Sequence, residues 1–214
     1  MFAIIGVNPI ATIAVQIIKN QSPMEYIFFV DDNEQKRNKV FNDVEVLCNN
    51  NELLEKIATG NPINLSISFG EKLLAKKKIL FNSLLQNANV SFPVLQHSSA
   101  LVSELATIKD GNILSFGTII GHNTILNYNS IIWAGVVIEH DSIIGESCYI
   151  APNVTISGFV KIGDCSLIGS GAVIMPEVEI GSHCIVGAGA VVTKNIPNNS
   201  IVAGVPAKII NQCN

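Results

Sequence analysis

Aliphatic residues recur at every sixth position through the second half of the sequence. Counting in sixes from Val102 to Val192, all sixteen positions are Ile, Leu or Val. This spacing fits neither a helix, with its period of 3.6, nor a half-buried strand, which alternates with period 2. It is typical of a triangular solenoid, in which each six-residue segment is one short strand and a turn. Three segments close a coil, so residues 18 apart stack, and we predict five coils of a left-handed parallel β-helix.

Small residues accompany this aliphatic column. Glycine follows the aliphatic residue at six positions: Gly121, Gly145, Gly163, Gly169, Gly181 and Gly187. We interpret these glycines as turn positions where φ is positive or the backbone is crowded. Small or β-branched residues recur two positions before the aliphatic residue, among them Cys148 and Cys184. Because these two thiols are expected at small inward positions, a cysteine nucleophile is not predicted.

Residues 1–95 lose the period of six and alternate between expected strands and helices. The expected strands are 2–7, 26–32 and 63–69, and the expected helices are 9–20, 51–58 and 71–88. This alternation predicts a small parallel sheet of Rossmann-like type. We therefore divide the chain into an α/β domain over 1–95 and a β-helical domain over 96–214. The segment 195–210 leaves the repeat and is expected to cap the open end of the solenoid.

Composition narrows the function classes. Hydrophobic residues make up 48% of the chain, charged residues only 14%, and the net charge is −4 with a single arginine, Arg37. A basic nucleic-acid footprint is therefore absent. No stretch reaches the roughly 18 uninterrupted apolar residues of a membrane span. The apolar N-terminus lacks a basic leader and is interrupted by Asn8-Pro9, and the five cysteines form no CxxC pair, so a cytoplasmic protein with reduced thiols is expected.

Four motifs in the repeats carry a resemblance to a known family: "IEHDSIIGE" (138–146), "ISGFVKIGD" (156–164), "IVGAGAVVTKNIP" (185–197) and "AGVPAKII" (203–210). Together with the "VDD" at 30–32, the chain resembles bacterial acetyltransferases that join a small Rossmann-like domain to a left-handed β-helix. This family includes N-acetyltransferases of nucleotide-linked 4-amino sugars and the related sialic acid O-acetyltransferases. The resemblance implies acetyl-CoA as co-substrate, a sugar-nucleotide acceptor, and a homotrimer with the coenzyme in the groove between two solenoids.

The resemblance also implies particular site residues. The catalytic group is His140 with its acidic partner Asp141, and the backbone N–H of Gly158 meets the acetyl carbonyl. The implied coenzyme contacts are Tyr149, Ser170 and Ala188. The implied sugar-nucleotide contacts are Asp31, Asp32 and Gly70. Lys194 and Lys208 flank the final coil, where they either meet the phosphates of coenzyme A or are simply solvated.

The sequence departs from the family at three places. The glycine-rich loop after the first strand is here "GVNPIA" (6–11), in which only Gly6 is kept. Without the later glycines, a phosphate is not assumed to lie on that turn. Trp133 stands where related enzymes tend to carry Asn, and Tyr149 stands at a position that is often His. These departures leave the reaction intact and bear on the identity of the substrate.

Among the four histidines, His140 is the candidate general base because an unperturbed imidazole titrates near neutrality. The adjacent Asp141 and the stacked Gly158 favour catalysis over a solvated turn residue. His122, 18 residues earlier, is expected to stack one coil above His140 on the same face. A metal site on these two histidines lacks a third ligand in that column, so we expect no metal. His97 and His183 are expected at the surface.

Two alternatives remain open at this stage. Asp31 and Asp32 end a predicted strand, where dinucleotide folds place an acid for a ribose hydroxyl, but the same pair serves equally well in a helix cap or turn. For the whole protein, the main prediction is N-acetylation of a nucleotide-linked 4-amino-deoxy sugar for surface-glycan synthesis. O-acetylation of sialic acid or another sugar hydroxyl is the first alternative, and a non-catalytic solenoid scaffold is the second.

Overall fold

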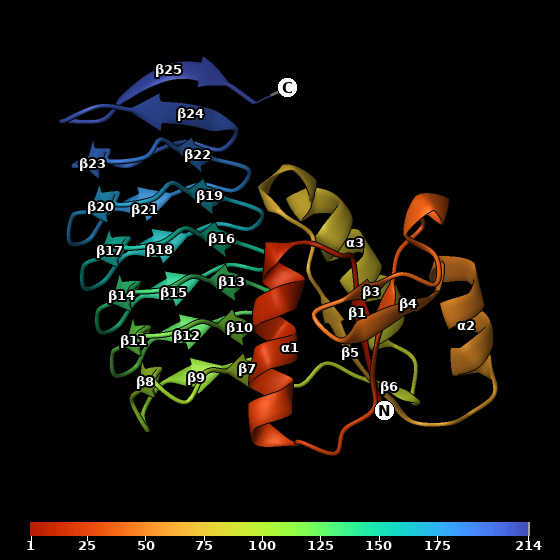
Figure 1. Ribbon diagram of the computed structural model, residues 1–214. Helices are drawn as coiled ribbons and strands as arrows, with labels where there is room; N and C mark the ends of the chain where they lie inside the picture. The colour runs from red at the N-terminus through yellow and green to blue at the C-terminus, as the bar shows by residue number, and fades with distance from the viewer. Residues whose placement is uncertain (214) are drawn as a thin grey trace. The chain divides into compact units, whose positions relative to one another are not determined.

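The computed structural model describes residues 1–213, and the chain divides into two compact units, Met1–Leu95 and Gln96–Asn214. Figure 1 shows an α/β unit in the first and a stack of short strands in the second. None of the helices within residues 1–213 combines the length and apolar composition needed to cross a membrane.

The N-terminal unit is built on a six-stranded sheet in the order β3-β4-β2-β1-β5-β6. Its strands are β1 (Phe2–Ile5), β2 (Ile27–Val30), β3 (Val40–Phe41), β4 (Val44–Cys48), β5 (Ile63–Ile67) and β6 (Val90–Ser91). Only the edge strand β3 pairs antiparallel, and the other five strands are parallel. The helices are α1 (Pro9–Gln21), α2 (Asn50–Ala58) and α3 (Leu74–Leu85), with 3₁₀ turns η1 (Glu34–Lys36) and η2 (Glu71–Leu73).

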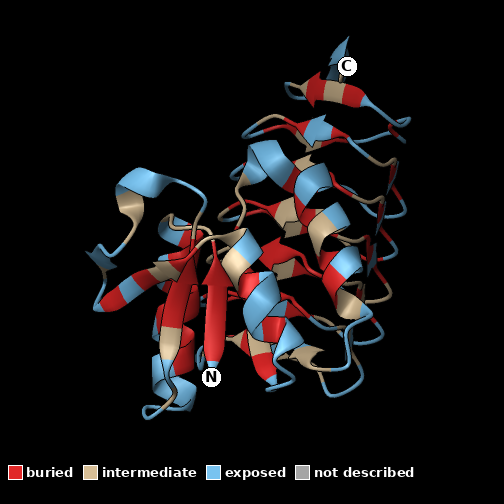
Figure 2. Cartoon of the chain, turned by 90° about the vertical axis from the view of Figure 1, so that its right-hand side faces the viewer, coloured by how far each residue is buried: buried red, intermediate tan, exposed pale blue. Residues whose placement is uncertain are grey.

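Local sequence explains where these elements begin. Strand β1 is an unbroken apolar run and all four of its residues are buried, as expected for a central parallel strand (Figure 2). Helix α1 starts at Pro9, whose missing N–H costs nothing at the first helical position, and Asn8 caps it by accepting from Ile10 and Ala11. Helix α2 starts with a capping box formed by Asn49 and Glu52.

The expected elements of this unit are present, with three differences. The first two strands end at Ile5 and Val30, before the polar turns that follow them. The expected helix 71–88 divides into η2 and α3. Strands β3, β4 and β6 were not expected, although Val44, Val46 and Cys48 in β4 carry the alternating buried pattern of a strand with one face on the core.

The C-terminal unit is a three-sided parallel β-helix (Figure 1). Face I holds β7 (Leu95–Gln96), β10 (Ile113–Leu114), β13 (Ile131–Ile132), β16 (Tyr149–Ile150), β19 (Leu167–Ile168) and β22 (Ile185–Val186). Face II holds β8 (Leu101–Val102), β11 (Ile119–Ile120), β14 (Val137–Ile138), β17 (Thr155–Ile156), β20 (Val173–Ile174) and β23 (Val191–Val192). Face III holds β9 (Thr107–Ile108), β12 (Ile125–Leu126), β15 (Ile143–Ile144), β18 (Lys161–Ile162) and β21 (Glu179–Ile180). Each strand pairs with the strand 18 residues later, as the period of six predicts.

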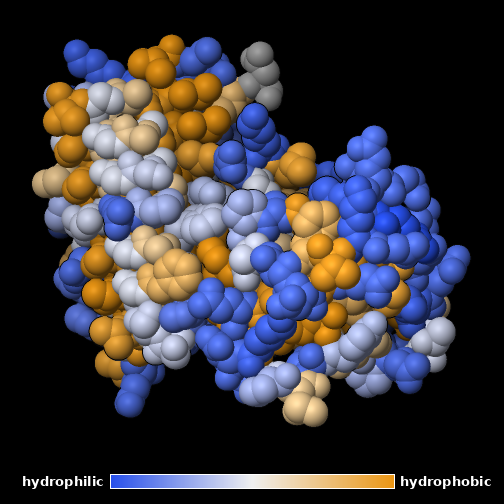
Figure 3. All heavy atoms as spheres, viewed as in Figure 1, coloured by the Kyte–Doolittle hydropathy of each residue, from blue (hydrophilic) through white to orange (hydrophobic). Residues whose placement is uncertain are grey.

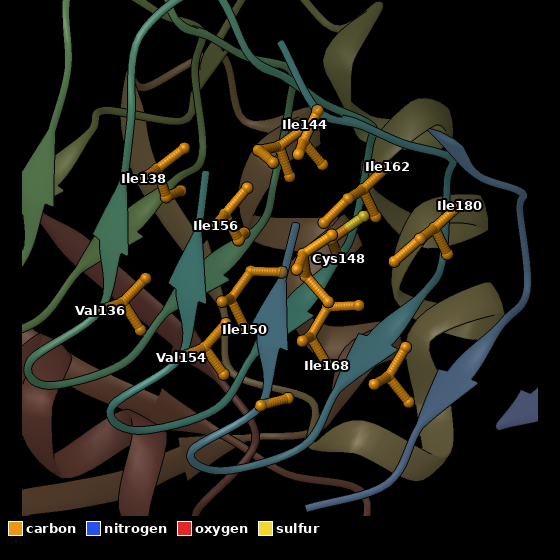
Figure 4. Close-up of a cluster of buried hydrophobic side chains, with 14 of the residues drawn as sticks. Val136, Ile138, Ile144, Cys148, Ile150, Val154, Ile156, Ile162, Ile168 and Ile180 are labelled. Carbon is orange, nitrogen blue, oxygen red and sulfur yellow. The ribbon is translucent and has the colours of Figure 1, made fainter. Parts of the chain in front are cut away.

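The aliphatic column forms the core of the solenoid. From Leu114 to Val192 every sixth residue is buried, and in Figure 4 these side chains point toward one another from the three faces. Val102 and Ile108 are only half-buried because they belong to the first coil, which has a neighbouring coil on one side only. The five coils from 102 to 192 are confirmed by the unbroken pairing of face II from β8 to β23.

The corners decide between the two reasons given for the glycines. The left-handed backbone falls on a different column, at every sixth residue from Gly111 to Gly189, and this column includes Asp141 and Phe159. The glycines after the aliphatic residues are needed for space instead. A Cβ on Gly163 would lie 2.5 Å from the backbone nitrogen of Ser182 in the next coil. Crowding between coils, rather than positive φ, therefore selects these glycines.

The end of the solenoid also differs from the prediction. The chain makes one further coil of sixteen residues, since β24 (Ser200–Ala203) still pairs in parallel with β22 and aligns Ile185 with Ile201. Strand β25 (Lys208–Gln212) then turns back and pairs antiparallel with β24. Part of the segment expected only to cap the solenoid therefore extends it first.

Candidate functional site

His140 lies at the corner between faces II and III, just after strand β14. Its Nδ1 lies 2.9 Å from Oδ2 of Asp141, and Oδ1 of Asp141 accepts a hydrogen bond from Nδ2 of Asn123 at 3.0 Å. The backbone of Asp141 is in the left-handed region (φ 56°), which Asp tolerates better than most residues do. This conformation places its carboxylate beside the His140 ring. The His140 side chain is 37% exposed, so it is open to a ligand.

The rings and backbone above and below His140 come from successive coils. The His122 ring stacks on the His140 ring with centroids 5.1 Å apart and planes 9° from parallel, which confirms the predicted spacing. On the other side lies Gly158, where a Cβ would be 2.7 Å from Cε1 and 2.9 Å from Nε2 of His140. Only glycine leaves room for the imidazole here.

The N–H of Gly158 is available to a ligand. Within residues 1–213 no acceptor is bonded to it. The equivalent amide at another corner, that of Glu146, donates to Oδ1 of Asp164 in the next coil at 2.8 Å. The residue 18 positions after Gly158 is Pro176, which has no side-chain acceptor to offer. A free donor therefore lies directly beside the ring of His140.

The electrostatics of the corner favour an ionised Asp141. The hydrogen bond from Asn123 and then the one from His140 lower the pKa of the Asp141 carboxyl below its usual value. An ionised carboxylate only accepts hydrogen bonds, so it fixes the proton of His140 on Nδ1 and leaves Nε2 as the basic nitrogen. The arrangement can take a proton from a nucleophile that approaches Nε2.

The expectation that His122 and His140 have no third metal ligand beside them is wrong. His122, His140 and Asp141 each place a ligand atom within 4.8 Å of the others, so a third ligand exists beside the column of histidines. The geometry suits a metal poorly, however. The lone pairs of a histidine lie in the plane of its ring, and two stacked, parallel rings do not aim them at one point. Asp141 is also already bonded to Nδ1 of His140.

The N-terminal unit has its own pocket, of about 260 Å³, where the parallel strands β1, β2 and β5 end. Two cations, Lys36 and Lys76, line it together with Asn50, Phe69 and Gly70. The carboxyl ends of parallel strands are the usual binding edge of such sheets. The pocket therefore combines two lysines, two aspartates and an aromatic ring at the expected edge.

Asp31 and Asp32 line this pocket but are used within the chain. Burial raises the pKa of Asp31, yet hydrogen bonds from Lys36 and from the N–H groups of Asn33 and Val7 outweigh it and leave that pKa lowered. Both oxygens of Asp32 accept from Asn50, one from its N–H and one from its side chain. Both carboxylates are therefore bonded within the chain, Asp31 at the turn after β2 and Asp32 at the first residue of α2.

The first loop confirms that a phosphate cannot be assumed at the start of α1. Oδ1 of Asn8 takes the N–H groups of Ile10 (2.9 Å) and Ala11 (3.2 Å), and the side-chain amide of Asn8 donates to the carbonyl of Ser68. These are the donors that a glycine-rich loop would offer to a phosphate. In this chain Asn8 occupies them.

The candidate coenzyme residues lie at other places on the solenoid. Ser170 and Ala188 stack one coil apart at the corner between faces I and II, linked by the bond from Gly189 N–H to Ser170 O. Tyr149 does not continue this column, because it lies on β16 of face I. Lys194 follows β23 at the His140 corner, and Lys208 is exposed on β25. Within one chain, these residues and His140 do not form a single cluster.

Trp133, one of the departures from the family, does not share a corner with His140: it follows β13 at the corner between faces I and II. It packs against the solenoid core after β13, and its ring lies 6.0 Å from that of Tyr149. His97 is half-buried against Phe116, with ring centroids 5.1 Å apart, whereas His183 is exposed as expected.

Sequence reasoning missed four residues of these sites: Asn123, Phe159, Lys36 and Lys76. A signal existed for Asn123, which lies 18 residues before Asp141 and so stacks on it. Phe159 lies one coil beyond Asp141 in the same column, and its ring meets the His140 ring edge-on at 5.2 Å. The two lysines carried no pattern, because only the folded sheet brings them to one edge.

Comparison with known proteins supports the fold and the class of enzyme. The bacterial transferase hexapeptide repeat matches residues 129–158 and 159–194. PerB from Caulobacter crescentus, solved with CoA and GDP-perosamine, has a TM-score of 0.88 at 26% identity, covering 98% of this chain and 97% of that one. The acetyltransferase domain of PglB from Neisseria gonorrhoeae, solved with acetyl coenzyme A, has a TM-score of 0.88 at 25% identity over 98% of both chains. WeeI from Acinetobacter baumannii has a TM-score of 0.82 at 25% identity, covering 98% of this chain and 99% of that one. No curated protein matches the sequence.

The repeats and the three stacked parallel sheets fit a left-handed β-helix, and the chain, which carries bacterial transferase hexapeptide repeats, is an acetyltransferase. Over its whole length it resembles the N-acetyltransferases of nucleotide-linked amino sugars, as the sequence motifs indicate.

Proposed function

We propose that the protein transfers the acetyl group of acetyl-CoA to the amine of a nucleotide-linked 4-amino-deoxy sugar, in the cytoplasmic synthesis of a surface glycan. The observation that carries this proposal is the arrangement of His140 between Asp141 and the free N–H of Gly158. The likeness to PerB, solved with CoA and GDP-perosamine, supports the substrate class.

The reaction is a direct transfer. As the amine nitrogen attacks the thioester carbonyl carbon, Nε2 of His140 takes a proton from it, and Asp141 stabilises the imidazolium that forms. The N–H of Gly158 donates to the developing oxyanion, where a preorganised donor contributes about 3 kcal/mol. When the carbon–sulfur bond breaks, His140 returns the proton to the departing thiolate of coenzyme A. Cys148 and Cys184 are fully buried, so no acyl-cysteine is proposed, and no metal is needed for these steps.

The N-terminal unit is proposed to hold the nucleotide. Its parallel strands follow the order β4-β2-β1-β5-β6, which is that of a Rossmann-like half-sheet with the reversal of strand order between β1 and β5. The pocket lies at that reversal, where ligands of open α/β sheets bind. Because Asn8 occupies the start of α1, we assign the phosphates to Lys36 and Lys76, with Asp31, Asp32 and Gly70 shaping the pocket.

A homotrimer would complete the site. The candidate coenzyme residues Ser170 and Ala188 lie at the corner between faces I and II, whereas His140 lies at the corner between faces II and III. Face II joins these two corners, and its outward residues form an uncharged ladder: Leu101, Ile119, Val137, Thr155, Val173 and Val191. Apolar residues recur over these strands in Figure 3. Packing of face II against a second copy would place the coenzyme corner of one chain beside the His140 of its neighbour.

The first prediction is the loss of turnover in His140→Ala. Acetyl-CoA consumption would be measured against a panel of UDP-, dTDP- and GDP-linked 4-amino-4-deoxy sugars and free sialic acid. Since removing a general base costs about 10² to 10⁴ in rate, kcat should fall by that order while the fold is kept, because the side chain lies at a partly exposed corner. His183→Ala, at another corner, is the matched control.

Three outcomes would contradict this proposal. Wild-type kcat in a folded His140→Ala protein would place the base elsewhere. Turnover of sialic acid alone would establish O-acetylation in place of N-acetylation. Absence of turnover with the whole panel would leave the solenoid as a binding scaffold.

A further inference from the structure

Phe159 is held in a backbone conformation that its side chain disfavours. Its φ is 60°, in the left-handed region where a bulky residue is a rare outlier. The other left-handed corners of the solenoid carry Gly, Asn, Asp, Ser, Cys, Glu or His. The Phe159 ring is also 54% exposed, so it gains little from burial in the core. A strained and exposed aromatic residue calls for a stabilising contact outside the chain.

The position of the ring indicates what that contact is. Phe159 directly follows Gly158, and its ring meets the His140 ring edge-on, with centroids 5.2 Å apart and planes at 87°. Its N–H donates to the carbonyl of His140 at 3.1 Å, which fixes the backbone of the corner against the coil above. The ring therefore forms a wall beside the two groups that act on the reacting atoms.

We propose that Phe159 positions the acceptor: the apolar C–H face of the sugar stacks on this ring and holds the amine at Nε2 of His140. This inference rests on the proposed function. Sugar C–H groups carry partial positive charge and are attracted to the negative face of an aromatic ring. The amide-rich arm of coenzyme A would instead need hydrogen-bond partners, which a phenyl ring does not offer.

Kinetics of three variants test this role with the best sugar nucleotide of the panel. Phe159→Leu keeps an apolar side chain but removes the aromatic face, and Phe159→Asn removes both. The KM for the sugar nucleotide should rise about 3- to 10-fold in Phe159→Leu, and further in Phe159→Asn, from the loss of stacking. Phe159→Tyr should stay near wild type. The KM for acetyl-CoA should not change in any of the three.

Thermal unfolding gives an independent measurement. Asn tolerates the left-handed region, so Phe159→Asn should raise Tm by about 2–4 °C while it weakens sugar binding. The control is Glu177→Asn, at the same corner one coil further along, where φ is 63°. It should raise Tm in the same way and leave both KM values unchanged.

A lower Tm in Phe159→Asn with unchanged KM would make Phe159 a structural residue and overturn the inference. A wild-type KM for the sugar nucleotide in Phe159→Leu, or a shift confined to acetyl-CoA, would also overturn it. Wild-type protein without turnover on any sugar nucleotide would instead defeat the proposed function itself, so the two failures are distinguishable.

Discussion

Asp141 shows how a single exposed residue is kept charged. Its carboxylate is not buried, yet the hydrogen bonds from Asn123 and His140 lower its pKa. A group whose pKa is lowered on folding stabilises the folded protein above its ordinary pKa, and this contribution is lost as the pH falls through the lowered value. At neutral pH the contribution is therefore fully present, and Asp141 remains a hydrogen-bond acceptor for His140.

The second prediction follows from this pairing. Asn123→Ala removes the hydrogen bond that contributes most to the lowered pKa, so the pKa of Asp141 should rise toward its ordinary value. Titration of the aspartate carboxyl carbons by NMR would measure the shift. Asn153→Ala is the control for strain, because Asn153 also occupies an exposed left-handed corner (φ 58°). An unchanged pKa of Asp141 in Asn123→Ala would show that His140 alone holds the carboxylate.

At the scale of elements, the two ends of the N-terminal sheet differ in charge and use. The carboxyl ends of β1, β2 and β5 surround the pocket with Lys36 and Lys76. A second hollow, near the end of α1, is lined by Lys19, Asp43, Glu25 and Glu45. Its single lysine pairs with Asp43 at 3.7 Å. Of these two hollows, only the first places lysines at the binding edge of a parallel sheet, although Lys36 also pairs with Asp31 at 2.7 Å.

The third prediction compares a lysine from each of these two hollows. Lys76→Ala should raise the KM for the sugar nucleotide about tenfold, because it removes one of two cations proposed to meet the phosphates, and should leave the KM for acetyl-CoA unchanged. Lys19→Ala should change neither constant. Steady-state kinetics with each substrate varied in turn would show the difference. If Lys76→Ala moved only the acetyl-CoA constant, the nucleotide would have been assigned to the wrong unit.

The strands and corners show which parts of the fold and of the site could be predicted from the sequence. The inward aliphatic column and the stacking of His122 on His140 follow from a period of six, because side-chain burial selects residue type at each repeat. The left-handed corner column escaped notice, since it admits Gly, Asn, Asp and even Phe159, so composition does not mark it. Contacts that depend on the folded sheet, such as Asn50 with Asp32, left no spacing to detect.

At the scale of the whole molecule, the three faces of the solenoid are unequal. Face III carries an exposed ion pair between Lys161 and Glu179 at 2.7 Å, whereas the outward ladder of face II has no charge within the described strands. Charged residues are depleted from the centres of stable interfaces. Of these two faces, face II is therefore the one we expect another copy to cover.

The fourth prediction tests that assembly. Wild-type protein should have the mass of three chains of 22.9 kDa by light scattering. Val173→Lys places an unpaired charge in the ladder of face II, so it should give monomers and lose turnover, whereas Ile143→Lys on face III should do neither. A monomeric wild-type protein with full activity, or a Val173→Lys variant that stays assembled, would remove the shared site from the proposed mechanism.

The 18-residue coil has a consequence for how this half of the chain can change in length. Each coil contacts only its neighbours, so a whole coil can be gained or lost while the remaining coils keep their pairing. An insertion of one residue inside a strand, in contrast, would turn the side chains that follow it in that strand to the opposite face. Within the repeats from Val102 to Val192, the length therefore changes most easily by eighteen residues, and only the last coil departs from this with sixteen. A coil removed between His140 and Gly158 would bring a proline, Pro176, under the imidazole, so evolution can trim the ends of this rod but not its middle.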